Sequence, residues 1–428
     1  MKREEGILFE DGFSSTKGVK RTIAPTIRQA QCYIKTDAPP PHDMGPALVP
    51  SMREIESIEP NGLQIVSTFS GCGGSCLGFR MAGYRTLFAS EFIPAAQETY
   101  RANHPGVHID TRDIRQLMAE DVFAATGLQR WELDVLEGSP PCASFSMAGK
   151  REAGWNTVKP YSDTKQRTDD LFFEFARLVD GLQPRVFVAE NVKGLTSGKA
   201  RGYLKEILAA LRGCGYKVKC AVMDAQYFGV PQHRERLIFI GVRDDIGIEP
   251  TFPKPAQKSM ALREALPHIV AVGANSGFGS EEFMDSGRPS STVGASPNTG
   301  NGRCPASLAV VDISRYAIGD EWDKLKPGEQ SEKYFQLTKA HPERPCGTIL
   351  QGSKCLSAAG VTHPFEKRKF TIAELKRICG FPDDFILTGT FAQQWERLGR
   401  AVSPPMMAAI ASHIRDTILQ PEQVQDVT

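Results

Sequence analysis

The chain has 428 residues, and its 51 lysines and arginines nearly balance its 50 aspartates and glutamates, so its formal charge is +1. At roughly 150 residues per domain this length predicts two or three domains. A hydrophobic content of 41% and a charged content of 24% exclude a wholly disordered chain, a collagen-like repeat and a disulfide miniprotein. No apolar run reaches the roughly 18 residues that span a bilayer. The near-neutral charge argues against a generic polyanion binder, although basic residues can still gather on one face.

The ten cysteines are scattered without a CxxC pair, and the first residues lack the apolar region of a signal peptide. We therefore expect a cytoplasmic protein whose cysteines are mostly reduced and buried. Cys72 and Cys76 lie four residues apart, but no histidine or second pair lies nearby, so no metal site is expected.

The residue pattern predicts an α/β fold. Residues 1–60 carry mixed charge and a PPP run, and we expect a partly disordered N-terminal extension with at most a short element at 28–34. Apolar runs at 63–69, 84–92, 133–138, 185–192 and 236–243 predict strands. Amphipathic segments at 94–104, 171–182 and 203–216 predict helices between them. This alternation predicts a doubly wound, mostly parallel sheet over residues 61–244.

The composition changes after this region. Residues 245–362 are rich in Gly, Pro, Ser and Thr, which predicts a smaller, loop-rich second domain. Helical periodicity returns from Phe370, and residues 395–419 end in a long helix. We expect residues 363–428 to pack back on the first domain and complete it.

Glycines follow the first predicted strand and open a helix, so that backbone can approach a ligand closely there. They are Gly71, Gly73, Gly74 and Gly78, and their spacing is not that of the dinucleotide-binding motif. The turn alone fits a nucleotide-like cofactor and a purely structural turn equally well. Glu91 ends the next strand, where such folds place a ribose-binding carboxylate, although a lone acid there is more simply a solvated surface residue.

Four further side chains are candidates for chemistry. Cys142 follows a Pro-Pro pair at a strand end, where a stiff loop presents its thiol as a nucleophile, if nearby cations or dipoles lower its pKa. Glu190 ends a buried strand and is either a structural hydrogen bonder or a general acid/base. Arg234 and Arg236 alternate at the start of a strand and can share one face, whereas His233 would face the other way.

In this order the motifs resemble those of the DNA cytosine-C5 methyltransferase family over almost the whole chain after residue 63. The matching segments are FSGCGG, Glu91, Asp113-Ile114, PPC followed by FS, ENV, GVPQHRER, FTIAELKRICGFPDDF and AVSPP. The resemblance implies a Rossmann-like S-adenosylmethionine-dependent methyltransferase fold, with a smaller target-recognition domain inserted at residues 245–362.

The resemblance also implies which residues bind S-adenosylmethionine. The glycine turn would cradle its methionine part, Glu91 would bind the ribose hydroxyls, and Asp113 and Ile114 would contact the adenine. The implied cofactor-binding set is Phe69, Gly71, Gly73, Gly74, Glu91, Asp113, Ile114, Pro141, Leu171, Arg400 and Val402.

The implied chemistry follows from cytosine, whose C5 is too poor a nucleophile to take a methyl group unaided. Addition of the Cys142 thiolate to C6 would make C5 nucleophilic. Glu190 would bind N3 and the exocyclic amine, Arg236 would hold O2, and Arg234 would support the thiolate or steady the loop. The base must flip out of double-stranded DNA, over which the basic loop 143–168 would close. We expect a monomer on DNA, with a cognate restriction endonuclease as a further partner.

The chain departs from the family's pattern at three positions. Ser67 replaces an Asp of the first motif, which we expect only to reshape a turn, and Ala143 replaces the Gln after the nucleophile. Arg400 replaces the Asn of the final Gly-Asn-Ala-Val motif, and a cation beside a sulfonium is repulsive unless an anion intervenes. Arg400 therefore either turns to a phosphate, a nearby acid or the substrate, or pairs with the extra carboxylate of carboxy-S-adenosylmethionine to yield carboxymethylated cytosine.

Two other functions use the same scaffold. One is a catalytically silent, sequence-specific DNA-binding protein, which would have no need of Cys142, Glu190, Arg234 and Arg236 together. The other is a tRNA methyltransferase, which the sizeable insertion at 245–362 disfavours. Whether the chain methylates DNA or only binds it, the balanced overall charge predicts that its basic residues are gathered in one cleft.

Overall fold

The computed structural model describes residues 44, 46–141, 159–161, 164–166, 170–198, 200–269, 311–355 and 357–420. Of the predicted N-terminal extension, residues 1–43 and 45, including the expected element at 28–34, lie outside the described residues. Residues 46–60 are described and form a helix that was not predicted, α2 (Met52–Glu56), with Ile55 buried. Cys142, Ala143 and most of the predicted loop 143–168 also lie outside the described residues. Within that loop, backbone is described for an antiparallel pair of short strands, β5 (Lys159–Tyr161) and β6 (Thr164–Gln166).

A seven-stranded sheet in the order β3-β2-β1-β4-β7-β9-β8 organises the first part of the chain. Its strands β3, β2, β1, β4 and β7 run parallel, and β9 runs antiparallel to both of its neighbours, β7 and β8. This arrangement confirms the predicted mostly parallel sheet. The strand bounds are β1 Gln64–Thr68, β2 Arg85–Ser90, β3 His108–Asp110, β4 Val135–Gly138, β7 Val186–Val192, β8 Tyr216–Asp224 and β9 Glu235–Arg243.

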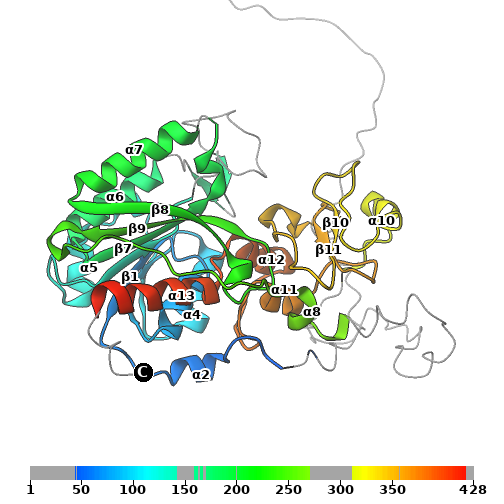
Figure 1. The fold of residues 1–428 in the computed structure, drawn as a ribbon, viewed down its shortest axis with the longest axis horizontal. Helices are drawn as coiled ribbons and strands as arrows, with labels where there is room; N and C mark the ends of the chain where they lie inside the picture. The colour runs from blue at the N-terminus through cyan, green and yellow to red at the C-terminus, as the bar shows by residue number, and fades with distance from the viewer. Residues whose placement is uncertain are drawn as a thin grey trace, which may run out of the picture. The chain divides into compact units, whose positions relative to one another are not determined.

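Helices cover both faces of this sheet (Figure 1). On one face, α5, α6 and α7 bury their apolar sides against the strands, and on the other face α3 and α13 do so. The helix bounds in this part are α2 Met52–Glu56, α3 Gly74–Met81, α4 Pro94–Asn103, α5 Ala119–Thr126, α6 Leu171–Leu182 and α7 Ala200–Gly213. Short single-turn helices are η2 Ile114–Gln116, η4 Lys193–Thr196, η5 Ala225–Tyr227 and η6 Asp244–Ile246.

The second region has a small core of its own. Its apolar cluster contains Ile313, Ile318, Trp322 and Leu337, apart from the two clusters that flank the large sheet. Its elements are α8 Leu262–Ala265, α10 Ala317–Trp322, β10 Thr338–Lys339, η8 Gln351–Lys354 and β11 Val361–Thr362, and β10 pairs in parallel with β11. The chain between β9 and α8 belongs to the core of the large sheet, because Ile246, Ile248 and Phe252 pack against it.

The C-terminal segment returns to the sheet, as expected from its helical periodicity. It forms α11 Ile372–Ile378, α12 Phe391–Arg400, α13 Pro404–Ile414 and η9 Arg415–Leu419. The Tyr84 hydroxyl donates to the backbone oxygen of Ala411 at 3.0 Å. Helix α13 lies so close to α3 that a Cβ on Gly78 would fall 2.6 Å from the Pro404 oxygen and 2.7 Å from the Met407 Cβ. No helix among the described residues is long and apolar enough to cross a membrane.

Gly78 is therefore a packing position, and its replacement by alanine should push α3 and α13 apart. We expect Gly78→Ala to lower the free energy of unfolding by about 1–3 kcal/mol. The matched control is Gly202→Ala in α7, where a Cβ meets nothing within 4 Å; it should leave stability unchanged or raise it by about 0.5 kcal/mol. Urea unfolding of both variants measures the difference, and equal effects would contradict the close packing.

Candidate active site

A pocket opens at the carboxyl ends of β1, β2, β3 and β4, the edge at which doubly wound sheets bind ligands. The start of α6 and the end of α12 complete its wall. Of the predicted cofactor-binding residues, those that line the pocket are Phe69, Gly71, Gly74, Glu91, Asp113, Ile114, Pro141, Leu171, Arg400 and Val402. The pocket thus gathers segments from both ends of the described chain, and Gly73 is the predicted residue that does not line it.

Other lining residues were not predicted, although two sequence signals point to some of them. Phe92 and Ile93 directly follow Glu91, and Arg397 lies one helical turn before Arg400. The full unpredicted set is Ser70, Cys72, Ser75, Ser90, Phe92, Ile93, Ala96, Arg112, Ser139, Arg397 and Ala401.

The glycine turn owes its shape to two close approaches. Gly71 and Gly73 have φ angles of 57° and 90°, which favour glycine. A Cβ on Gly73 would lie 2.1 Å from the His104 ring, and a Cβ on Gly74 would lie 2.3 Å from the Val402 oxygen. Gly73 therefore makes room for a buried histidine, whereas Gly74 makes room for the chain segment that follows α12.

Glu91 ties the glycine turn to the end of β2. Its carboxylate accepts hydrogen bonds from the backbone amides of Gly71 at 2.7 Å and Ile93 at 2.6 Å. Burial raises the pKa of Glu91, and these amides oppose that rise. Each carboxylate oxygen keeps a second lone pair, so the group can also accept hydrogen bonds from the hydroxyls of a ligand.

Arg115 fixes the far end of the pocket. Its guanidinium bridges Asp113, at 2.9 Å, and Asp170, at 2.6 Å. Asp113 lines the pocket beside Ile114, and Asp170 immediately precedes Leu171, which also lines it. One arginine therefore ties the pocket segment after β3 to the start of α6.

Arg400 lies beside an acid. Its guanidinium pairs with Glu396 at 2.7 Å, one turn earlier on α12. Glu396 also pairs with Lys354 of η8 and lies 3.5 Å from Arg397. Burial alone would raise the pKa of Glu396, but Lys354, Arg400 and Arg397 bring it below its usual value. Of the alternatives for Arg400, contact with a nearby acid is the one that the described residues contain.

Glu190 and Arg236 form an ion pair at the ends of two neighbouring strands. Glu190 lies near the end of β7, and the Arg236 Nε approaches its carboxylate at 2.7 Å from β9. The next residue, Asn191, is buried and donates to the Pro140 oxygen at 3.0 Å. It thereby holds the segment that leads to Cys142, which itself lies outside the described residues. The role of Asn191 was not predicted, although the ENV motif contains it.

Arg234 lies under the end of α12. Its side chain is 2% exposed and donates to the backbone oxygens of Gly399 at 3.1 Å and Ala401 at 2.8 Å. Burial and the neighbouring Arg236 charge lower the pKa of Arg234 to about 9. His233 instead pairs with Asp224 at 2.6 Å and is half exposed. Arg234 thus fixes the turn that carries Arg400 and Val402 to the pocket.

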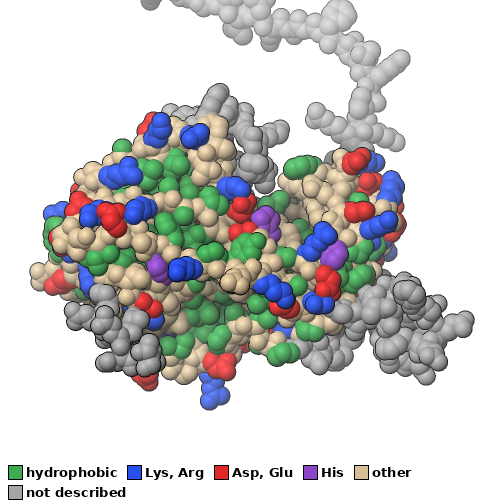
Figure 2. Space-filling model, viewed as in Figure 1, with side chains coloured by type: hydrophobic (Ala, Val, Ile, Leu, Met, Phe, Trp, Pro, Cys, Tyr) green, Lys and Arg blue, Asp and Glu red, His purple; other side chains and the backbone are tan. Residues whose placement is uncertain are grey.

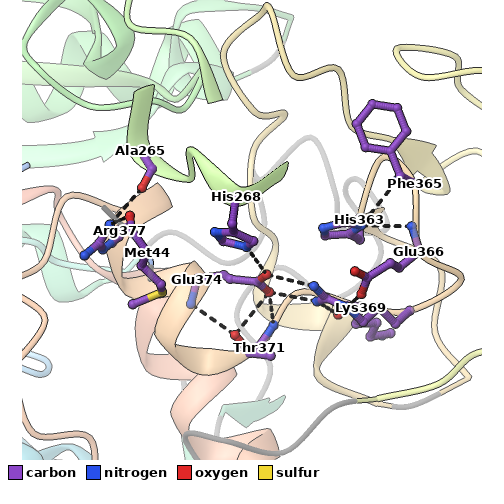
Figure 3. Close-up of polar contacts among 11 residues, drawn as sticks. Met44, Ala265, His268, His363, Phe365, Glu366, Lys369, Thr371, Glu374 and Arg377 are labelled. Carbon is purple, nitrogen blue, oxygen red and sulfur yellow. Dashed lines mark hydrogen bonds and ion pairs between the residues drawn. The ribbon is translucent and has the colours of Figure 1, made fainter. Parts of the chain in front are cut away.

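A second cluster has the residue types of a metal site, but its carboxylate is already hydrogen-bonded throughout (Figure 3). The Glu374 carboxylate accepts two hydrogen bonds from Arg368, two from Thr371 and one from the His268 Nε2. The His363 Nδ1 accepts from backbone amides of its own loop, so in the neutral ring the proton is on Nε2. The lone pairs of the Glu374 carboxylate are therefore already used, and the Arg368 charge repels a cation. The cluster joins α11 to the segments before it.

The sequence pattern of the family described as C-5 cytosine-specific DNA methylase matches residues 63–416. The Type II methyltransferase M1.HphI of Haemophilus parahaemolyticus is 33% identical over 358 residues, covering 82% of this chain and 86% of that protein. The Type II methyltransferase M.DdeI of Desulfomicrobium norvegicum is 30% identical over 387 residues, covering 82% and 88%.

Two solved structures share the fold. One, described as a DNA modification methyltransferase encoded within an Escherichia coli prophage, gives a TM-score of 0.60 at 22% identity and covers 84% of this chain and 100% of that one. The Dnmt2 methyltransferase of S. pombe gives 0.53 at 18% identity, covering 83% and 98%. These likenesses confirm the predicted methyltransferase fold. With the family pattern matched from β1 to the last helices, the chain belongs to the C-5 cytosine-specific DNA methylase family and is a DNA cytosine methyltransferase.

Proposed function

We propose that this chain flips a cytosine out of a specific DNA sequence and methylates its C5 through a covalent adduct between Cys142 and C6. The observation that supports this most is the Glu190–Arg236 pair, whose atoms lie 2.7 Å apart at the strand ends next to the Pro140–Pro141 segment. A carboxyl group that carries a proton to N3 and accepts from the exocyclic amine, together with a guanidinium that donates to O2, can bind this edge of one cytosine.

The side chains divide the chemistry between them. The Cys142 thiolate adds to C6, which makes C5 nucleophilic. Glu190, as the protonated acid, donates its proton to N3 as the thiolate adds and accepts a hydrogen bond from the exocyclic amine, and Arg236 orients Glu190 and donates to O2. Loss of the C5 proton after transfer allows the thiolate to leave. When bound, S-adenosylmethionine would supply the electrophilic methyl group on its sulfonium, and Glu91 and Asp113 would accept hydrogen bonds from its adenosine part.

We assign target recognition to residues 245–362, between the catalytic segments 61–244 and 363–428.

Curated relatives are Type II methyltransferases, so a cognate endonuclease is the partner that we infer. On the face drawn in Figure 2, basic and acidic side chains are interspersed. The predicted basic cleft depends on loop 143–168, which lies mostly outside the described residues. Bisulfite-type sequencing of DNA from cells that express the protein would identify the target sequence.

Covalent trapping tests the nucleophile. On duplex DNA whose target cytosine carries fluorine at C5, and with S-adenosylmethionine present, the methylated adduct has no C5 proton to lose and cannot eliminate. We therefore expect a stable protein–DNA complex in denaturing gels. Cys142→Ser should abolish it. The matched control is Cys355→Ser, which removes an exposed free thiol and should leave the complex intact. A wild-type protein that binds this DNA without a covalent complex would instead be the silent binder.

The two arginines of the Q-x-R-x-R motif should differ in effect. Arg234→Lys loses hydrogen bonds to Gly399 and Ala401, and one charged hydrogen bond contributes about 1.5–3 kcal/mol, so the Kd for S-adenosylhomocysteine should rise about tenfold or more. Arg236→Lys should leave this Kd within about twofold and lower the single-turnover methylation rate by about a hundredfold. Calorimetry and quench-flow assays measure the two quantities, and identical profiles would refute the division of roles.

Arg400 should not require a carboxylated cofactor, because Glu396 already pairs with it. We expect mass spectrometry of DNA treated with both cofactors in equal amounts to show 5-methylcytosine as the main product. Arg400→Asn should keep that outcome. If carboxymethylcytosine predominates in the wild type and disappears in Arg400→Asn, the carboxymethyl alternative is correct.

A further inference from the structure

Glu137 is a buried acid that the mechanism above does not use. It lies in the central strand β4 and is 1% exposed. No lysine or arginine among the described residues forms an ion pair with it. Burial raises the pKa of Glu137 to about 8, although the hydroxyls of Ser67 and Ser75 oppose the rise. Burying a carboxyl group costs free energy that an apolar side chain would not cost. Its presence here therefore suggests a function beyond packing.

Two hydroxyl groups connect Glu137 to the cofactor pocket. The Ser67 hydroxyl donates to the Glu137 carboxyl group and lies 2.7 Å from the Ser70 hydroxyl. Ser70 lines the pocket at the start of the glycine turn, and Ser75 lines it from the first turn of α3. Glu137 is therefore linked to the pocket residue Ser70 through one intervening hydroxyl group, that of Ser67.

The position of Ser67 explains why the acid is there. We expected the replacement of the family's Asp by Ser67 only to reshape a turn, and this expectation is wrong, because Ser67 lies within β1 and is fully buried. Its register partner on β4 is Glu137. The acid that Ser67 removes from β1 is thus replaced by an acid directly beside it on the next strand.

We propose that Glu137 is a positioning residue of the cofactor site, which replaces the first-motif acid, holds the glycine turn through Ser67 and Ser70, and favours the cationic cofactor over its neutral-sulfur product. The proposal rests on the assignment of this pocket to S-adenosylmethionine. The sulfonium carries a positive charge that S-adenosylhomocysteine lacks, and the two molecules share every other charged group. An ionised Glu137 beneath the pocket distinguishes them electrostatically.

The protonation of Glu137 makes this discrimination depend on pH. Below about pH 8 the carboxyl group is mostly protonated, so a sulfonium that favours the ionised form must displace a proton. The affinity for S-adenosylmethionine relative to S-adenosylhomocysteine should therefore rise as the pH rises from 7 to 9.

The other titratable groups around Glu137 come from three elements. Glu190 on β7 adds a negative charge that raises the pKa of Glu137 further. Cys76 on α3 and Tyr100 on α4 are buried, which raises the pKa of Cys76 to about 12 and that of Tyr100 well above its usual value. These two groups stay protonated near pH 8, so they do not account for a proton released there.

Calorimetry on the full chain in two buffers of different ionisation enthalpy counts the protons. At pH 7.5 we expect binding of S-adenosylmethionine to release more protons than binding of S-adenosylhomocysteine. The affinity ratio should rise about fivefold or more between pH 7 and pH 9. Glu137→Gln should remove both effects, whereas Glu98→Gln, which changes an exposed acid on α4, should keep them. A wild-type ratio that is flat with pH, or a pH dependence that survives in Glu137→Gln, overturns the proposal.

Two variants that move the acid from β4 back to β1 test whether Glu137 replaces the first-motif acid. This test remains valid even if Glu137→Gln fails to fold. Ser67→Asp alone puts two buried carboxyl groups in contact and should lower the Tm and weaken S-adenosylhomocysteine binding. Adding Glu137→Ser returns one acid to β1 and should restore both, whereas additive losses refute the replacement. Trapping through Cys142 is a separate readout. If trapping fails while the proton effects hold, the proposed function is wrong and the role of Glu137 stands.

Discussion

The pocket at the carboxyl ends of the strands depends on one contact, the packing of residues 399–402 against the glycine turn of residues 71–74. A Cβ on Gly74 would lie 2.3 Å from the Val402 oxygen, so only glycine permits this approach. Arg234 holds the same segment from below through the oxygens of Gly399 and Ala401. Both the glycine and the buried arginine are therefore consequences of closing a site from chain segments more than three hundred residues apart.

The same segment carries Arg400, the positive charge that replaces the Asn of the family's final motif. Glu396 pairs with Arg400 at the pocket wall and with Lys354 of η8, in the region assigned to target recognition. A single buried carboxylate thus lies between the cofactor site and that region. Because removing one partner of a buried ion pair leaves the other charge uncompensated, the geometry at Arg400 and the placement of η8 cannot change independently.

Periodicity and motif spacing predicted the sheet, α4, α6, α7 and the returning C-terminal helix, because each buries one regular apolar face. Strands β3 and β8 escaped prediction because they lie at the two sheet edges, where β3 has only three residues and the burial of β8 does not alternate cleanly. Motifs also located most of the pocket, yet they could not reveal that Gly73 faces His104, that Asn191 holds Pro140, or that Ser67 pairs with Glu137. Those contacts join residues far apart in sequence, and only the strand register and the turn geometry bring them together.

The buried carboxyl groups of the chain differ in what stabilises their negative charge. Six carboxyl groups are buried among the described residues: Glu91, Asp110, Glu137, Glu190, Glu374 and Glu396. Arginine pairs with four of them, and two backbone amides hold Glu91. Glu137 has hydroxyl groups alone, which stabilise a carboxylate far less than a cation does. We therefore infer that ionisation of Glu137 requires a positive charge from outside the protein. The sulfonium of a cofactor bound in the adjoining pocket would supply that charge.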